Sequence, residues 1–487
     1  MMIDRLRFVC LMLLSAVLFG GCSDSDEDIP EVGSVSVTAV SSESHVLHFD
    51  IAAKNLLKCA YLCVEAGENG ITAEDVLERG TDVGTNAVTS VKVDDLKSST
   101  TYTVFVAGKD ASQHILKQIQ MTTAKEDKVL THTVLLYMMG NNGLEKYMDN
   151  NLSKIKSVAG QIPEHGRLVV FYDRGNYTNL TEIYRDKESG RVKQRIIKEY
   201  VPDKTSSVDP AFMEGVLNEV VKAFPSDTYG LIFSSHGGGW VPSKIFDLYL
   251  TDRGRGSTVG SRFFGQDAQD CMEIPDLADV LSKFKFEYII FDACFMASVE
   301  ALYDLRYTTK TIIASVAAIM GAGFPYKEVI PLLYTEDHSL KQICEAFMNF
   351  YKDLSGTIAL VDCKNLDGLA EQMRKIVAAG KEPESVKGIQ AYEGFKSHLY
   401  FDFEQYVEAL TQDEGLLSDF RDALHKAVPY TGHTPTVYTD YVVRGETNHF
   451  LPLPRSCGLS CHIEQADFPE THEAFLKTSW AKKIGSN

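Results

Sequence analysis

Between residues 131 and 315 the chain contains five short, almost wholly apolar runs, separated by stretches long enough to form helices or hairpins. A strand buried on both faces of a sheet has this composition, whereas a strand with one face in water alternates apolar and polar residues. Such strands, alternating with helices, are typical of an α/β/α sandwich with a mostly parallel sheet. The runs are residues 133–139, 167–172, 229–235, 286–291 and 311–315.

The segments around these runs fit the same fold. Helices are predicted over 144–158, 210–224 (with Asp209 as N-cap), 340–352, 366–379, 401–410 and 415–428, a hairpin over 181–200, and short strands over 357–362, 437–443 and 459–463. Six tyrosines between 392 and 441 are expected to pack in the core, the alternative being a wall of a substrate site. We therefore expect 131–487 to be one domain, whose last third extends its α/β core.

Residues 31–125 have a different pattern, in which short runs alternate polar and apolar residues between Gly, Ser and Asp turns. This predicts antiparallel strands, and 95 residues suit a small all-β sandwich. Residues 95–106, followed by 121–123, resemble the last two strands of a fibronectin type III module. Such modules are spacers or protein-binding units, and this one contains no catalytic cluster.

Residues 1–22 indicate an export signal. After a short basic start, residues 8–19 form an apolar run of 12 residues, which suits a signal peptide and is too short to span a bilayer. The run ends in a segment that resembles a bacterial lipobox, so we expect Cys22 to become the acylated first residue, although Leu18 lies four rather than three positions before it. The alternative is an ordinary secretory signal in which Cys22 is incidental.

The next stretch, residues 23–30, is an acidic tether. It resembles the export signal of surface lipoproteins in Bacteroides-like bacteria; the alternative is a solvated linker. We expect an exported lipoprotein, held at the outer membrane or cell surface by a lipid on Cys22, with no transmembrane helix. The formal net charge of −19 argues against nucleic acid as a partner, because phosphate binding needs a basic face.

Ten cysteines suggest a disulfide set, but Cys10 leaves with the signal and Cys22 would be lipidated. The pairs Cys59/Cys63 and Cys457/Cys461 lack the two-residue gap and the paired histidines of a zinc site. We interpret the remaining cysteines, Cys294 excepted, as buried free thiols in strands.

Two of the predicted strands lead into reactive side chains. The strand 229–235 is followed at once by His236 and three glycines, and the strand 286–291 ends three residues before Cys294. The carboxyl ends of neighbouring parallel strands meet at one edge of a sheet, so both side chains are expected to face one substrate. A lone His or a lone Cys is more often a packed core residue, but the pair in this setting predicts a dyad, in which His236 accepts the thiol proton.

The glycines after His236 let a backbone N–H group approach a substrate carbonyl with no Cβ in the way. We expect the oxyanion hole to consist of the N–H groups of Gly237 and of Cys294 itself.

The order of the two blocks resembles the caspase-like clan of cysteine peptidases and, within it, the clostripain family. The resemblance covers 131–487 and extends to Tyr137–Glu145, Gly321–Tyr326, Gly458–Ser460 and Trp480. It implies an endopeptidase that acts on protein or peptide substrates through a thioester, with Cys294 as nucleophile and His236 as base and acid.

The family generally cleaves after Arg or Lys, so the resemblance implies that Asp292 is an acidic group of the first specificity pocket. The alternative for Asp292 is a strand-end residue that caps backbone N–H groups. Residues 316–322 lack the second carboxylate that is expected there, and Ala317, Ala318 and Ala322 occupy the segment. A basic side chain beside one carboxylate loses much of its pairing, so the alternative is a small or uncharged first-position residue. Asn141 also replaces an expected Asp.

Some relatives mature by self-cleavage between the catalytic blocks, and the polar, Gly-rich stretch 251–257 predicts processing near Arg253–Arg262. Some also depend on calcium. No EF-hand-like loop occurs here, so no metal or other cofactor is assigned. The alternative from another functional class is a catalytically silent surface adhesin whose sandwich module binds the partner.

Overall fold

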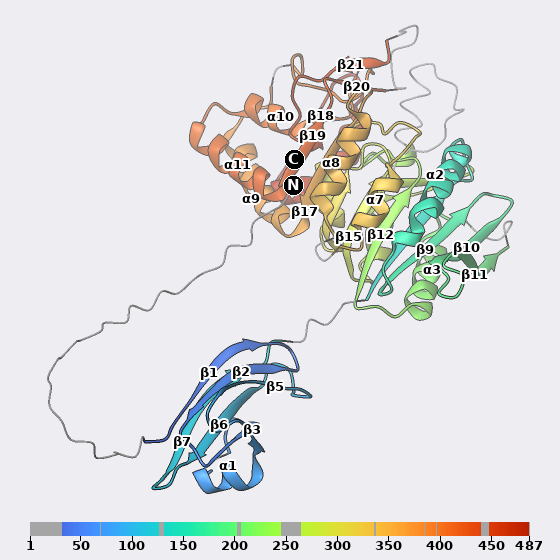
Figure 1. Cartoon of the computed structure of the whole chain (residues 1–487). Helices are drawn as coiled ribbons and strands as arrows, with labels where there is room; N and C mark the ends of the chain where they lie inside the picture. The colour runs from blue at the N-terminus through green and yellow to red at the C-terminus, as the bar shows by residue number, and fades with distance from the viewer. Residues whose placement is uncertain are drawn as a thin grey trace. The chain divides into compact units, whose positions relative to one another are not determined.

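The computed structural model describes residues 32–68, 70–125, 131–201, 206–244, 264–335, 338–383, 385–395, 397–439 and 448–486. The chain divides into two compact units, Met1–Lys128 and Val129–Asn487 (Figure 1). The expected signal peptide with Cys22, the tether 23–30 and the processing stretch Arg253–Arg262 lie outside the described residues.

The first unit is a sandwich of two antiparallel sheets. One sheet has the order β1 (Ser34–Ser42), β2 (Leu47–Lys54), β5 (Val88–Val93), and the other the order β4 (Thr81–Asp82), β3 (Lys58–Glu65), β6 (Thr101–Lys109), β7 (His114–Thr122). Every second residue of β2, including Phe49 and Ile51, is buried between the sheets, as strand geometry requires of a half-buried strand. Helix α1 (Ala73–Arg79) covers Ala60 and Phe105 on the outer face of the second sheet. The predicted small all-β domain is confirmed.

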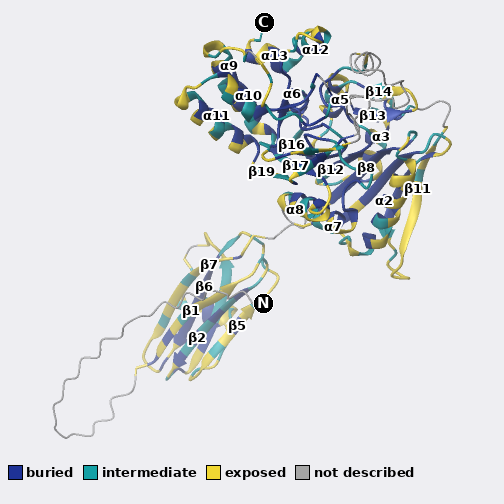
Figure 2. Cartoon of the chain, turned by 90° about the horizontal axis from the view of Figure 1, so that it is seen from above, coloured by how far each residue is buried: buried dark blue, intermediate teal, exposed yellow. Residues whose placement is uncertain are grey.

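The second unit is built on one nine-stranded sheet, counted within the described residues. Its order is β11 (Val192–Tyr200), β10 (Thr178–Arg185), β9 (Gly166–Asp173), β8 (His132–Met139), β12 (Thr228–Ser234), β15 (Phe286–Asp292), β16 (Thr309–Ala314), β17 (Thr357–Asp362), β19 (Tyr430–His433). The five strands from β9 to β16 are parallel, and the two strands at each edge pair antiparallel. The edge strand β11 is largely exposed (Figure 2).

Both faces of the sheet are covered by helices, which confirms the α/β/α sandwich. Successive residues of β8 enter two different cores, Leu135 and Tyr137 on one face and Leu136 and Met138 on the other. Helices α2 (Glu145–Val158), α7 (Tyr326–Leu332) and α8 (Leu340–Tyr351) pack on the second of these faces. The first face carries α3 (Pro210–Ala223), α5 (Ile274–Leu281), α6 (Val299–Leu305), α9 (Leu366–Ala379), α10 (Phe403–Leu410), α11 (Glu414–Ala427), α12 (Pro469–Phe475) and α13 (Ser479–Ile484).

Several short elements complete the second unit: β13 (Phe264–Asp267), β14 (Asp270–Met272), β18 (Phe401–Asp402), β20 (Thr436–Tyr438), β21 (Phe450–Pro452), β22 (Ser460–Cys461) and the 3-10 turns η1 (Ala159–Gln161) and η3 (Cys363–Asn365). Of the predicted strand 437–443, residues beyond 439 lie outside the described part. No helix in the described ranges is long and apolar enough to cross a bilayer.

None of the cysteines that the structure describes forms a disulfide. The expectation that these thiols lie in strands is wrong for three of them, one of which, Cys457, lies in the loop between β21 and β22. Cys344 lies in α8, where it packs on the sheet as part of an amphipathic helix, and Cys363 lies in the turn η3. Cys63, Cys271 and Cys457 are half-buried rather than buried.

Candidate active site

Strand pairing places the two predicted catalytic blocks at the same edge of the sheet. Strands β12 and β15 are parallel neighbours, and Ser234 lies opposite Asp292 at their carboxyl ends. His236 and Cys294 each follow this pair by two residues. The backbone N–H of Ser235 donates to the carbonyl of Asp292 at 3.3 Å, so the two chains stay together beyond the strands.

The glycine loop after His236 lies directly against the backbone of Cys294. A Cβ on Gly237 would come within 2.5 Å of the Cys294 carbonyl oxygen and 3.2 Å of its nitrogen. Gly239 has φ +58°, and a Cβ there would lie 2.5 Å from the Phe295 carbonyl oxygen. Only glycine allows this approach. The structure therefore brings together Gly237 and Cys294, the residues predicted to donate to an oxyanion.

His236 is half-buried, and this burial lowers the pKa of its imidazole to about 4. The ring is therefore neutral at pH 7, which is the form that accepts a proton. Gly265 donates its N–H to the His236 carbonyl at 3.0 Å, and Gly237 forms a β-bridge with Phe264. Strand β13, which sequence reasoning missed, thus holds the His236 loop through backbone pairing.

Cys294 is half-buried and its sulfur accepts a hydrogen bond. The backbone N–H of Ile319 points to Sγ at a nitrogen–sulfur distance of 3.3 Å. A donor at this position stabilises the thiolate more than the thiol. Ile319 belongs to the loop after β16, whose Ala317 carbonyl also accepts the N–H of Phe295 at 3.2 Å.

The carboxylate of Asp292 lies beneath this edge of the sheet and is only 6% exposed. It accepts hydrogen bonds from the Tyr326 hydroxyl at 2.7 Å and the Ser234 hydroxyl at 3.3 Å. Burial raises the pKa of Asp292 to about 6, against the lowering effect of these bonds and of the Phe324 N–H. Gly323, with φ +66°, approaches so closely that a Cβ would lie 2.6 Å from the carboxylate.

The loop 316–322 carries no acidic residue, and its alanines differ in exposure. Ala317 is buried, whereas Ala318 and Ala322 are half-buried. The Tyr147 ring, half exposed on α2, lies so close to Gly321 that a Cβ there would meet it at 2.9 Å. Tyr147 was not among the predicted site residues, because an exposed aromatic side chain on a helix gives no sequence signal of its own.

The structure gives a reason for Asn141. Its side-chain amide donates to the Asp267 carboxylate at 2.6 Å, while the other oxygen of Asp267 accepts the Ser207 N–H at 2.7 Å. Asp267 is buried, and burial of the nearby Asp173, together with the charge of Asp267, raises the pKa of Asp173. A third carboxylate at position 141 would add repulsion to this pair, whereas the amide supplies a donor. Within the described residues, no three His, Cys, Asp or Glu side chains are grouped as a metal site.

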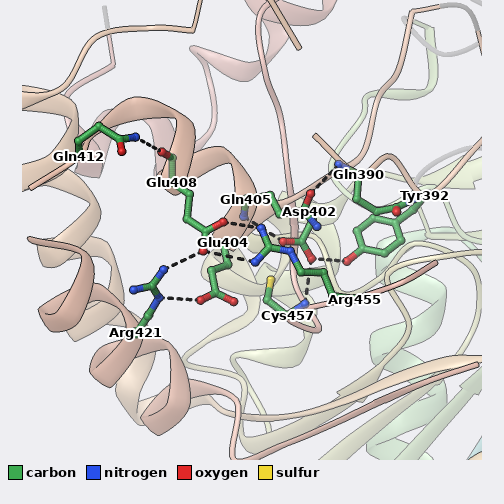
Figure 3. Close-up of polar contacts among 10 residues, drawn as sticks. All are labelled: Gln390, Tyr392, Asp402, Glu404, Gln405, Glu408, Gln412, Arg421, Arg455 and Cys457. Carbon is green, nitrogen blue, oxygen red and sulfur yellow. Dashed lines mark hydrogen bonds and ion pairs between the residues drawn. The ribbon is translucent and has the colours of Figure 1, made fainter. Parts of the chain in front are cut away.

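The C-terminal extension also reaches this edge of the sheet. Ser460 donates its N–H to the Ala297 carbonyl at 3.0 Å, three residues beyond Cys294. The preceding segment is fastened to α10 (Figure 3): Arg455 pairs with Glu408, and the N–H of Cys457 donates to the Asp402 carboxylate at 2.8 Å. The extension is therefore part of the structure that supports the site.

Comparisons with known proteins agree with this arrangement. The model of the clostripain family matches residues 136–443. An inactive zymogen C11 protease from Parabacteroides distasonis is 28% identical, covering 73% of this chain and 98% of its own, with a TM-score of 0.65. A secreted C11 cysteine protease from Bacteroides thetaiotaomicron, in complex with an irreversible peptide inhibitor, is 25% identical with the same coverage and a TM-score of 0.64. None of the curated proteins compared matches the chain.

Proposed function

The chain belongs to the clostripain family and is a cysteine peptidase, and we propose that it is an exported endopeptidase in which Cys294 is the nucleophile and His236 the general base and acid. The observation that carries the proposal is the meeting of both residues beyond the paired ends of β12 and β15, with the loop of His236 against the backbone of Cys294.

In the proposed reaction, neutral His236 takes the thiol proton of Cys294, and the thiolate attacks the scissile carbonyl carbon. The new C–S bond converts the carbonyl oxygen to an oxyanion, which the N–H groups of Gly237 and Cys294 stabilise. Collapse breaks the C–N bond, and His236 returns the proton to the departing amine. Water, deprotonated by His236, then hydrolyses the thioester and releases Cys294.

We propose cleavage after Arg or Lys, with Asp292 as the acidic group beneath the first pocket. Its position two residues before Cys294 and its pKa of about 6, which leaves it mostly ionised at pH 7, support this. The alternative is an uncharged first-position residue. Specificity for an uncharged residue is favoured by the two hydroxyl groups that already donate hydrogen bonds to the Asp292 carboxylate, and by the alanines at 318 and 322.

We further propose that the enzyme is lipid-anchored through Cys22 and that the first unit is a fibronectin type III-like spacer or binding module. The packing of a three-stranded sheet against a four-stranded sheet supports the assignment of the first unit as a fibronectin type III-like module. So does Tyr102, whose hydroxyl accepts the N–H of Lys97 at 2.8 Å, five residues upstream, as in a tyrosine corner. Self-processing near Arg253–Arg262 also stays a proposal.

A positional peptide library tests the proposed function. The chain lacking residues 1–22 is compared with its C294A and H236A variants, and with C271A, which removes a half-buried thiol of β14. We expect cleavage after Arg or Lys by the parent and C271A, and a loss of more than a thousandfold in C294A and H236A. Cleavage after another residue would overturn the proposed specificity alone. Turnover that persists in C294A, or no turnover in the parent, would overturn the mechanism and favour the adhesin.

A further inference from the structure

Phe295, the residue directly after Cys294, has an unusual backbone conformation. Its φ is +59°, in the left-handed region, although the residue has a bulky side chain. For a non-glycine residue this conformation is strained, and it persists when the surroundings hold it. The turn at Phe295 therefore contributes to the orientation of the peptide group that joins Cys294 to Phe295.

Tyr400 contacts this turn from the C-terminal extension. Its ring stacks on the ring of Phe295, with the centroids 4.4 Å apart and the planes at 11°, and both side chains are fully buried. Offset stacking of this kind adds stabilisation beyond the burial of apolar area. It therefore favours the strained conformation that follows the predicted nucleophile.

The same side chain also contacts the second catalytic loop. The Tyr400 hydroxyl donates a hydrogen bond to the carbonyl of Gly238, at an oxygen–oxygen distance of 2.5 Å. This bond fixes the peptide that joins Gly238 to Gly239, one residue beyond the predicted donor Gly237. Tyr400 thus contacts both loops that meet at the site, through its ring on one and its hydroxyl on the other.

The backbone of Tyr400 is itself well held. Its carbonyl accepts the N–H of Tyr392 at 3.0 Å, and the preceding Leu399 donates its N–H at 2.6 Å to Glu393, a buried carboxylate that collects several such bonds. The next residue, Phe401, pairs in β18 with Cys461 of β22. Because these bonds hold the backbone of Tyr400 in place, its side chain can fix the position of the groups that it contacts.

We propose that Tyr400 is a positioning residue that clamps the Gly237–Gly239 loop to the Cys294–Phe295 turn and so aligns the two N–H groups of the oxyanion hole. The inference rests on the proposed function, because it assigns those groups to catalysis. In this role Tyr400 acts through its contacts with Phe295 and Gly238, that is, through the geometry of the two loops.

The test is Y400F, which keeps the stack on Phe295 and removes the bond to Gly238. The matched control is Y137F, because the Tyr137 hydroxyl also donates to a carbonyl, that of Ser207 at 2.9 Å, and this equally buried ring packs against Phe171 and Phe233 of the neighbouring strands. Two rates are measured: peptide hydrolysis per active site, titrated with an irreversible peptidyl inhibitor, and alkylation of Cys294 by iodoacetamide, followed by mass spectrometry. Hydrolysis needs the oxyanion hole, whereas alkylation needs only the activated thiol.

We expect Y400F to lower kcat at least tenfold, with KM and the alkylation rate of Cys294 unchanged within twofold, and Y137F to leave all three unchanged. An unchanged kcat in Y400F, or an equal fall in hydrolysis and alkylation, would overturn the inference. If Y400F does not fold, F295L weakens the same clamp from its other side and should show the same split, the absence of which would also overturn it. A parent enzyme that neither hydrolyses peptides nor reacts at Cys294 would instead refute the proposed function.

Discussion

Replacing Glu300 by Gln should make the second unit more stable at alkaline pH. Glu300 lies in α6, six residues after Cys294, and is fully buried. One carboxyl oxygen accepts the N–H of His462 at 2.8 Å, and no described residue donates to the other. The pKa of Glu300 is raised from an ordinary value of 4.5 to about 8, mainly because the carboxyl group is buried.

The sign of the effect follows from proton binding. Between pH 4.5 and 8 the folded protein keeps the proton of Glu300 and the unfolded chain releases it. The contribution of Glu300 to stability is therefore complete below pH 4.5 and is lost as pH rises to 8. Each pH unit in this window costs about 1.4 kcal/mol, so the total is roughly 5 kcal/mol. Gln keeps the shape of the side chain but has no proton to lose.

Urea unfolding followed by tryptophan fluorescence measures this effect. Both tryptophans, Trp240 and Trp480, are buried in the second unit, so the signal is specific to it. From pH 5 to 8.5, the free energy of unfolding of the parent should fall several kcal/mol further than that of E300Q. Other titrating groups are common to both proteins and cancel in the difference. Parallel pH profiles of the free energy of unfolding in the parent and in E300Q would refute the reasoning. The control variant is E287Q, which removes a carboxylate from the surface of β15, and its pH profile should match that of the parent.

Three further outcomes are expected. In G237A the new Cβ, 2.5 Å from the Cys294 carbonyl oxygen, should lower kcat at least a hundredfold with an unchanged circular dichroism spectrum, and near-normal kcat would contradict the loop geometry. D292N should lower kcat/KM for Arg and Lys peptides about a hundredfold but spare uncharged ones; an equal fall for both classes would make Asp292 a structural residue. Y102F should destabilise the first unit by about 1 kcal/mol in calorimetry, and no change would exclude a tyrosine corner.

Much of the core sheet could be predicted because its strands have their own sequence signature. The apolar runs at 229–235 and 286–291 correspond to β12 and β15, and their adjacency in the sheet places the blocks of His236 and Cys294 together. This inference needed only the parallel arrangement, since neighbouring parallel strands end at the same edge.

The supports of the site could not be predicted in the same way. Strand β13 has four residues, too few to show a period, yet it holds the His236 loop. Tyr400 looks like one core tyrosine among several, and its contact with Gly238 spans 162 positions in the chain. The hydroxyl groups that donate to Asp292 belong to Ser234 and Tyr326, which are distant from it in the sequence. Only the folded chain therefore shows why that carboxyl group is buried and yet has hydrogen-bond partners.

The central claim, that Cys294 attacks the peptide carbonyl with His236 as its base, is tested most directly by locating the covalent adduct of a peptidyl ketone inhibitor. After reaction at pH 7, digestion and mass spectrometry should find the inhibitor on Cys294, with no adduct in C294A and a rate at least a hundredfold slower in H236A. An adduct on another cysteine, or an unchanged rate in H236A, would contradict the account.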